Sequence, residues 1–382
     1  MQPDIGILRE LDGITQRRID GGTLAGAAYA VAYRGKTVFE NALGYADIEN
    51  RVPMGPDTVL RLASMTKPIT GVAVMQLAEQ GQLSLDDPVS AYIPGFEKMQ
   101  VAVLDAEGRM IGQTPAKTQI RIRDLLNHTS GLGSGPVGDA AWKAYGLREG
   151  DTLDTLMPRF AAQILDFEPR TRTAYSWTQA FDVAAWIVQQ VSGMAFERCV
   201  QERILGPLGC RDTTYTPDAG QWARLMKMYD TKDGALVEVD MGGRIFGSVP
   251  LSYHAAGAGM VGTLNDYMKF AAMLYARGEG NGARILRPET VDRMAAPSVG
   301  ALYDPARDAE TWGLSMRVIG RTTPTQRLCP GCFGWSGAYG THFFIDPQHA
   351  LYAVYMTNHA SAGGAGAATA REFEAVIARS VT

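Results

Sequence analysis

Extended, β-prone segments lie near both ends of this chain, whereas the long middle region follows a helical pattern. Residues 27–43 form one predicted β-hairpin around Gly35, and residues 341–356 form another around Asp346-Pro347. Strands at the two ends and helices between them favour one arrangement. We predict an α/β (α+β) fold in which both termini build an antiparallel sheet and an all-helical domain is inserted.

Helical patterns flank the predicted strands. Ile7, Leu11 and Ile14 share one face of an N-terminal helix, and residues 368–378 form a C-terminal helix. Periodic structure stops after residue 84, at Asp86-Asp87-Pro88. We therefore expect an α/β domain from residues 1–84 and 241–382, and a helical domain with a small hairpin from residues 85–240. The active site is expected in the cleft between them.

Two other segments carry local predictions. Apolar side chains alternate with polar or small ones from Trp312 to Val318, which predicts that strand structure resumes there. Residues 133–150 are rich in glycine and small side chains, which indicates a mobile loop.

The charge balance restricts the partners. The formal net charge of the 382 residues is -4, without a basic stripe for nucleic acid or a polybasic patch for a membrane surface. No apolar run reaches the length of a bilayer span, and the N-terminus lacks the pattern of a signal peptide. We expect a soluble, cytoplasmic protein that binds a small molecule, with no nucleic-acid or membrane partner. The composition does not set an oligomeric state.

The four cysteines, Cys199, Cys210, Cys329 and Cys332, are too few and too uneven for a disulfide-rich secreted fold. Cys329-Pro330-Gly331-Cys332 is a single CxxC pair with no histidine at metal-binding spacing in the sequence. We interpret it as a tight turn with two free thiols, with a redox or zinc role as the alternative. No metal site and no cofactor are predicted.

The tetrad Ser64-Met65-Thr66-Lys67 begins a long, largely apolar helical segment. A serine and a lysine three residues apart at the start of a helix share one face, about one turn apart. Their hydroxyl and amine are therefore predicted to be in contact. The segment is apolar nearly all round, which indicates burial.

Other hydrolase motifs are missing. The closest approach to a GxSxG elbow is Gly334-Trp335-Ser336-Gly337-Ala338, which lacks the final glycine, and HExxH is absent. His128 is interpreted as a structural histidine. A serine nucleophile needs a base, and lysine and tyrosine both have reference pKa values near 10. We therefore treat Lys67 and a neighbouring tyrosine as one coupled unit.

Four ordered blocks resemble the serine β-lactamase and penicillin-binding-protein superfamily. They are Ser64-Met65-Thr66-Lys67, the segment 120–132, Tyr175-Ser176, and residues 334–340 ahead of Phe343-Phe344-Ile345-Asp346-Pro347. The similarity covers nearly the whole chain. Within the superfamily the sequence looks most like the family VIII carboxylesterases, which have the class C β-lactamase fold.

The resemblance implies a role for each matching residue. Ser64 is the expected nucleophile, Lys67 its activating neighbour, and Tyr175 the general base and the proton donor to the leaving group. The backbone N–H groups of Ser64 and Ala338 are the expected oxyanion hole.

Two motifs depart from the β-lactamases of this class. Their Lys-Thr-Gly is replaced by Trp335-Ser336-Gly337, and their Tyr-x-Asn by Tyr175-Ser176-Trp177. Trp335, Ser336, Gly337 and Trp177 are the predicted substrate-binding residues. The missing cation favours neutral esters over β-lactam carboxylates.

We therefore predict a serine carboxylesterase that cleaves short-chain esters through an acyl-enzyme on Ser64. The alternatives within the fold are a D-amino-acid amidase or peptidase, an acyltransferase, or a weak β-lactamase.

Overall fold

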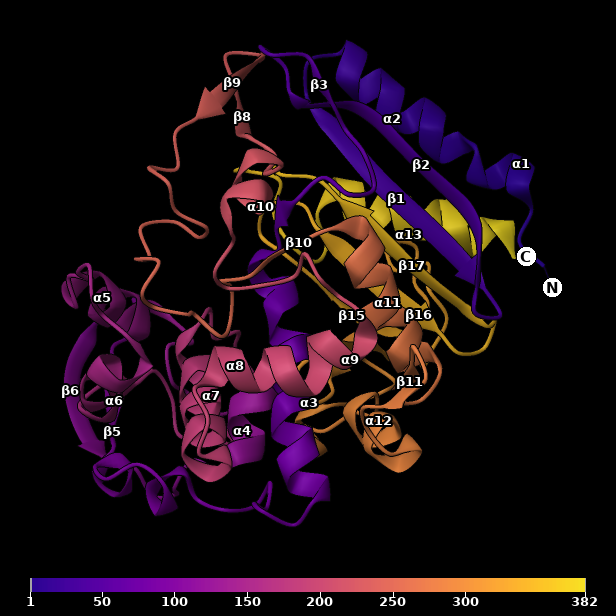
Figure 1. The fold of residues 1–382 in the computed structure, drawn as a ribbon. Coiled ribbons are helices and arrows are strands. Elements are labelled where there is room, and N and C mark those ends of the chain that lie inside the picture. The colour runs from indigo at the N-terminus through magenta and orange to yellow at the C-terminus, as the bar shows by residue number, and fades with distance from the viewer. Residues whose placement is uncertain (1, 382) are drawn as a thin grey trace.

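A computed structural model describes residues 2–381 and divides into a sheet part and a helical part (Figure 1). The largest sheet has eight antiparallel strands in the order β13-β14-β15-β16-β17-β1-β2-β3. In that order the strands are Glu310–Trp312, Arg317–Ile319, Phe333–Ser336, His342–Asp346, Leu351–Met356, Gly26–Tyr33, Lys36–Asp47 and Val52–Pro53. This confirms the predicted antiparallel sheet with strands from both ends of the chain.

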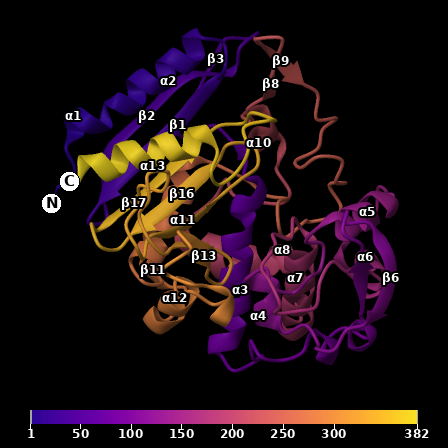
Figure 2. The ribbon, with the colours of Figure 1, turned by 180° about the vertical axis from the view of Figure 1, so that it is seen from behind.

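The two terminal hairpins meet where β1 pairs with β17. Their register runs from Ala28 opposite Met356 to Tyr33 opposite Leu351. Because neither strand lies at an edge, both are buried nearly throughout. The two ends of the chain also lie side by side at one end of the sheet (Figures 1 and 2).

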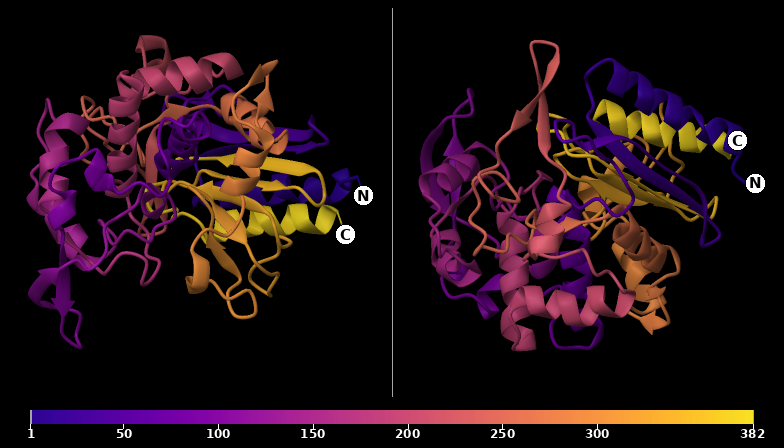
Figure 3. Two further views of the ribbon diagram at one scale, coloured as in Figure 1. Left: turned by 90° about the horizontal axis from the view of Figure 1, so that it is seen from below. Right: turned by 45° about the horizontal axis from the view of Figure 1, so that its top comes forward.

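Helices cover both faces of the sheet, as Figure 3 shows. Successive side chains of a strand point to opposite faces. Tyr355 therefore packs on Phe373 of α13 (Ala368–Ser380), which lies with α1 (Ile5–Leu8) and α2 (Glu10–Asp20) on one face (Figure 2). Phe343 packs on Tyr267 of α11 (Leu264–Tyr275), which covers the other face.

The helical part is joined to the sheet part by α3 (Thr66–Glu79), which is buried from Thr66 to Leu77 and contacts α7 (Gln179–Ser192). Its other helices are α4 (Ile122–Leu126), α5 (Pro136–Ala144), α6 (Leu153–Ala161), α8 (Phe196–Val200) and α9 (Gly206–Leu208), with a π-helical turn at Gln201–Leu205.

The predicted small hairpin is confirmed as β5 (Gln100–Leu104) and β6 (Met110–Pro115), which a third strand, β7 (Ile164–Leu165), extends into a small sheet.

Shorter elements complete the fold. They are α10 (Ala219–Ala223), α12 (Pro288–Met294), the pair β4 (Leu60–Arg61) with β10 (Val261–Gly262), the pair β8 (Met228–Lys232) with β9 (Ala235–Val239), and the pair β11 (Glu279–Gly280) with β12 (Ala283–Arg284). In the described residues 2–381, no helix has both the length and the apolar character that crossing a membrane requires.

The predicted return of strand structure at Trp312 is confirmed by β13 and β14, between which the chain turns at Ser315, whose φ of 73° lies in the left-handed region. One local prediction was wrong. The predicted loop 133–150 contains α5. The Asp166 carboxylate accepts hydrogen bonds from the N–H groups of Val137 and Gly138 in the first turn of this helix. Asp166 is distant in sequence, so the segment itself gave no sign of this stabilising contact.

The division at residues 84/85 and 240/241 remains a prediction. The β8–β9 hairpin, which that division assigns to the helical domain, contacts the sheet part. The Tyr229 hydroxyl accepts a hydrogen bond from the Ile48 N–H at 2.8 Å, and Lys227 pairs with Asp47 at 3.5 Å.

Candidate active site

Ser64 lies in a single 3-10 turn, η1 (Ala63–Met65), that runs directly into α3. One turn later, the Lys67 Nζ donates a hydrogen bond to the Ser64 Oγ over 3.4 Å. Ala63, the residue before the serine, has a φ of 46°, a conformation that costs free energy for a side chain with a Cβ. Such strain gathers at functional sites because the surrounding packing has to maintain it.

Lys67 is fully buried, and backbone oxygens hold its amine. The Nζ donates to the carbonyl of Gly257 at 2.9 Å and to the carbonyl of Trp177. With Ser64 these make three acceptors, which matches the three N–H bonds of a lysine ammonium. A Cβ on residue 257 would lie 2.8 Å from the Trp177 carbonyl oxygen, so glycine is needed for this close approach.

Tyr175 and Trp335 complete the cluster from two different parts of the chain. The Lys67 Nζ lies 4.8 Å from the centre of the Tyr175 ring. The Trp335 Nε1, at the end of β15, donates a hydrogen bond to the Tyr175 hydroxyl oxygen over 3.3 Å. The fold therefore brings a hydroxyl, an amine, a phenol and an indole into one cluster.

The backbone around Gly337 approaches the serine turn closely. A Cβ at this position would lie 2.2 Å from the Leu62 carbonyl oxygen, so only glycine fits there. In the described part of the chain, residues 2–381, neither the Ser64 N–H nor the Ala338 N–H donates to a protein acceptor. Both predicted oxyanion-hole donors are thus available to a ligand.

Ser336 and Trp177, two of the predicted substrate-binding residues, have side chains that are placed differently from that of Trp335. The Ser336 hydroxyl is buried and lies 2.7 Å from the His342 Nδ1, and His342 in turn contacts Glu374 of α13. This side chain therefore lies on the α13 side of the sheet, opposite to Trp335. The indole of Trp177 is 61% exposed, and its carbonyl rather than its ring contacts Lys67.

His128 and Trp312 belong to the cluster and were not among the predicted site residues. The His128 Nδ1 accepts a hydrogen bond from the Ser176 N–H at 3.1 Å, and its ring lies 4.7 Å from that of Tyr175. Burial and the charge of Lys67 hold the pKa of His128 well below its ordinary value, so the ring stays neutral. Trp312 stacks on Tyr175 at 5.9 Å. These contacts hold the Tyr175 segment in place.

Asp182 is a second residue that the sequence analysis missed. Its carboxylate, buried in α7, accepts hydrogen bonds from the Ala256 N–H at 2.7 Å and from the Tyr253 hydroxyl. It therefore anchors the segment whose Gly257 carbonyl binds Lys67. Burial raises the pKa of Asp182 from 3.8 to about 6. The sequence contained one signal that could have identified Asp182, because it is an acidic residue within the apolar run after Ala180.

A cavity of about 600 Å³ opens beside the cluster. Mainly apolar and aromatic residues line it, among them Trp142, Trp177, Phe246, Val249 and Ala338. Lys143 is the one lysine or arginine among the lining residues of this cavity in the described chain. Most of the wall therefore suits an uncharged ligand.

The sheet, the inserted helices and the buried serine–lysine pair define a hydrolase of the serine β-lactamase and penicillin-binding-protein fold. The Beta-lactamase family profile matches residues 11–376, and the chain belongs to this family.

Relatives and solved structures agree with this assignment. The chain is 35% identical to Protein Rv1367c of Mycobacterium tuberculosis, over 89% of this chain and 87% of the relative. It is 30% identical to esterase EstB of Burkholderia gladioli, over 97% and 95%. The solved structure of EstCE1, described as a hydrolase with promiscuous acyltransferase activity, matches with a TM-score of 0.80 at 28% identity, covering 98% of both chains.

Proposed function

We propose that this protein is a carboxylesterase that cleaves short-chain esters through an acyl-enzyme on Ser64. The contact of the buried Lys67 Nζ with the Ser64 Oγ carries the proposal, because it joins a nucleophile to a cation in a water-poor site. The similarity to esterase EstB supports the same reaction class.

In the proposed mechanism, Tyr175 is the general base and Lys67 is the neighbour coupled to it. Three acceptors around the Lys67 Nζ hold the amine beside Ser64, and the indole N–H of Trp335 is directed at the Tyr175 oxygen. Tyr175 takes the proton of the Ser64 hydroxyl as the Oγ attacks the ester carbonyl. The negative charge that develops on the carbonyl oxygen is bound by the N–H groups of Ser64 and Ala338.

Tyr175 then returns its proton to the departing alkoxide, which leaves as an alcohol, and Ser64 holds the acyl group. A water molecule gives its proton to Tyr175 and attacks the acyl carbonyl in the second half of the cycle. That proton returns to the Ser64 Oγ as the carboxylic acid leaves. Atoms and charges balance over the cycle without a cofactor.

The test combines active-site labelling with a substrate panel. A fluorophosphonate should add its mass to the peptide that contains Ser64, and Ser64→Ala should lose both the labelling and the hydrolysis of p-nitrophenyl esters. The melting temperature of the variant should stay within a few degrees of the wild type. Labelling at another residue, or ester turnover in Ser64→Ala, would contradict the mechanism. A D-amino-acid amide and a chromogenic cephalosporin in the panel test the amidase and β-lactamase alternatives.

Acyl transfer to an alcohol is the second candidate, which the apolar cavity beside Ala338 favours. An apolar alcohol in that cavity would replace water in the second half of the cycle. Adding such an alcohol should then produce a new ester and raise the rate of p-nitrophenol release if deacylation is rate-limiting. Inhibition without a new ester would exclude this reaction.

A further inference from the structure

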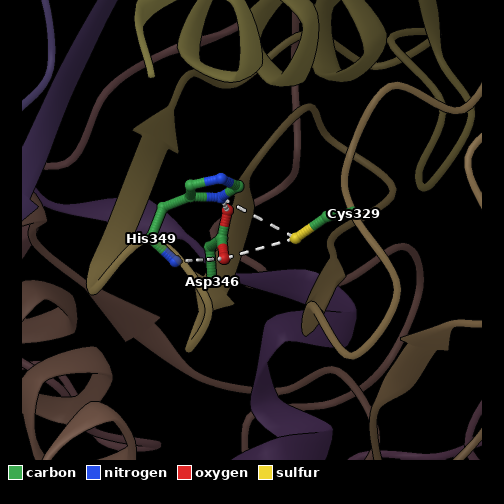
Figure 4. A group of neighbouring side chains, drawn as sticks. All are labelled: Cys329, Asp346 and His349. Atoms are coloured by element: carbon green, nitrogen blue, oxygen red, sulfur yellow. Dashed lines mark hydrogen bonds and ion pairs between the residues drawn. The ribbon is translucent and has the colours of Figure 1, made fainter. Parts of the chain in front are cut away.

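A cluster of possible metal ligands lies at the other end of the β15–β16 pair from Ser336. Cys332 directly precedes β15, and Asp346 is the last residue of β16. Cys329 belongs to the loop before β15, and His349 to the turn between β16 and β17. Figure 4 shows the side chains of Cys329, Asp346 and His349 directed at one another.

Sequence spacing hid this cluster, because His349 follows Cys329 by 20 positions. Phe333 of β15 pairs with Ile345 of β16. The loop before β15 and the turn after β16 therefore lie at the same end of the sheet. The Cys329 Sγ then lies 3.4 Å from the Asp346 Oδ1 and 3.9 Å from the His349 Nδ1. The His349 Nδ1 lies 2.7 Å from the Asp346 Oδ2.

The donor atoms suit one small divalent ion. One thiolate sulfur, one imidazole nitrogen and one carboxylate oxygen, all within 4.8 Å of one another, are the donor types that zinc prefers. Around a tetrahedral zinc ion with bonds of about 2.0–2.3 Å, such donors stand roughly 3.3–3.8 Å apart. The 3.4 Å distance between the Cys329 Sγ and the Asp346 Oδ1 already lies in this range. The 2.7 Å contact of the Asp346 Oδ2 with the His349 Nδ1 has to lengthen by about half an ångström, and the 3.9 Å distance between the Cys329 Sγ and the His349 Nδ1 has to shorten slightly.

The surroundings concentrate acidic groups. Cys329 lies 3.3 Å from the buried Cys332, sulfur to sulfur, and its Sγ is also 3.4 Å from the Asp346 carboxylate. Within residues 2–381, no lysine or arginine pairs with Asp346, whose ion-pair partner is His349. A bound cation would neutralise the Asp346 carboxylate and the thiolate that Cys329 forms on binding, and the His349 backbone N–H already orients the carboxylate at 3.0 Å.

We propose that Cys329, Asp346 and His349 bind one Zn²⁺ ion. The ion joins the loop before β15 to the β16–β17 turn and so stabilises the end of the sheet opposite to Ser64. Binding releases the proton of the Cys329 thiol to solvent, and no oxidant or reductant takes part. The site is separate from the proposed ester chemistry and does not depend on it.

The experiment uses the full-length chain, reduced and freed of metal with a chelator. Zinc titration followed by gel filtration and elemental analysis should find one zinc per chain. Cobalt in place of zinc should give the charge-transfer absorption of a thiolate ligand, and Cys329→Ser and His349→Gln should each weaken zinc binding at least tenfold. Zinc should also raise the melting temperature of the wild type.

His254→Gln is the matched control. His254 forms a comparable pair with Glu197 at 3.2 Å, and it lies outside the cluster, so this variant should bind zinc like the wild type. The cobalt spectrum of the wild type tests the thiolate ligand even if a variant fails to fold. A cobalt complex without thiolate absorption, or full zinc binding by Cys329→Ser and His349→Gln, would overturn the proposal. A Cys329–Cys332 disulfide in the isolated protein, with no zinc bound after reduction, would overturn it too.

Discussion

The indole N–H of Trp335 donates a hydrogen bond to the hydroxyl oxygen of Tyr175 over 3.3 Å. Trp335 stands where the serine β-lactamases that the chain resembles carry the lysine of Lys-Thr-Gly. An indole can donate to a phenolate oxygen, but it carries no charge. We therefore expect Trp335 to keep a donor for Tyr175 without supplying the cation that would attract a substrate carboxylate.

Trp335→Phe should reduce ester kcat/KM by about ten- to a hundredfold, since a hydrogen bond to a charged group contributes roughly 1.5–3 kcal/mol. Phenylalanine keeps the aromatic contact with Tyr175, so the melting temperature should change little. Steady-state ester kinetics and thermal unfolding measure the two effects.

Trp312→Phe is the control for that experiment. Trp312 stacks on Tyr175 at 5.9 Å and forms no hydrogen bond with it in the described chain. Its replacement should leave ester kcat/KM nearly unchanged. An equal loss of kcat/KM in both variants would show that aromatic packing, and not the N–H donor, controls Tyr175.

Lys67→Met and Tyr175→Phe should each lower kcat by two to four decades, because Tyr175 is the proposed general base and Lys67 the neighbour coupled to it. Methionine fills the buried space of Lys67 better than alanine would. Because the two groups are proposed to act as one coupled unit, the double variant should be hardly slower than either single variant. Losses that multiply in the double variant would assign the residues to separate steps.

Asp182 makes the stability of the folded protein depend on pH. Its pKa is raised from 3.8 to about 6, so the folded protein binds this proton more tightly than the unfolded chain. The resulting stabilisation is fully present below the unfolded pKa, and it is lost as the pH rises through about 6. A shift of about two units corresponds to roughly 3 kcal/mol.

Asp182→Asn removes this titration. The free energy of unfolding of the wild type, relative to the variant, should therefore fall by up to about 3 kcal/mol from pH 4 to pH 7. Urea unfolding of both proteins across this range measures the difference. The pH dependence that other carboxylates contribute is present in both proteins and cancels when the two free energies are subtracted. A difference that does not vary with pH would contradict the raised pKa.

The wild type should cleave p-nitrophenyl esters far faster than a chromogenic cephalosporin, because Trp335 cannot neutralise the cephalosporin carboxylate. Trp335→Lys should shift the ratio of the two kcat/KM values toward the cephalosporin by roughly one to two decades. Ester turnover should fall at the same time through lost packing.

Lys143 provides the control for this prediction, because it is a lysine that lines the cavity and could itself bind a substrate carboxylate. Lys143→Ala should leave the ester-to-cephalosporin ratio unchanged. If Lys143→Ala abolishes cephalosporin turnover while Trp335→Lys has no effect on the ratio, the carboxylate is bound at Lys143 and the role assigned to Trp335 is wrong.

Features that depend on local geometry were predictable from the amino-acid order alone. The spacing of Ser64 and Lys67 places both on one helix face whatever surrounds them, because an α-helix repeats every 3.6 residues. The β-prone runs and turn residues in 27–43 and 341–356 likewise predicted the two hairpins, which the structure contains. Four ordered motifs then pointed to the family that the comparisons confirmed.

Contacts between distant segments were decided by packing. Trp335 reaches Tyr175 only because β15 lies next to the serine turn, and His349 reaches Cys329 only because β15 pairs with β16. Asp166 likewise turned a glycine-rich segment into a helix by binding its first-turn amides. The type of a residue determines which bonds its side chain can form. The partner of that side chain, however, depends on the free energy of the whole packed chain, and distant segments contribute to this free energy as much as neighbouring ones do.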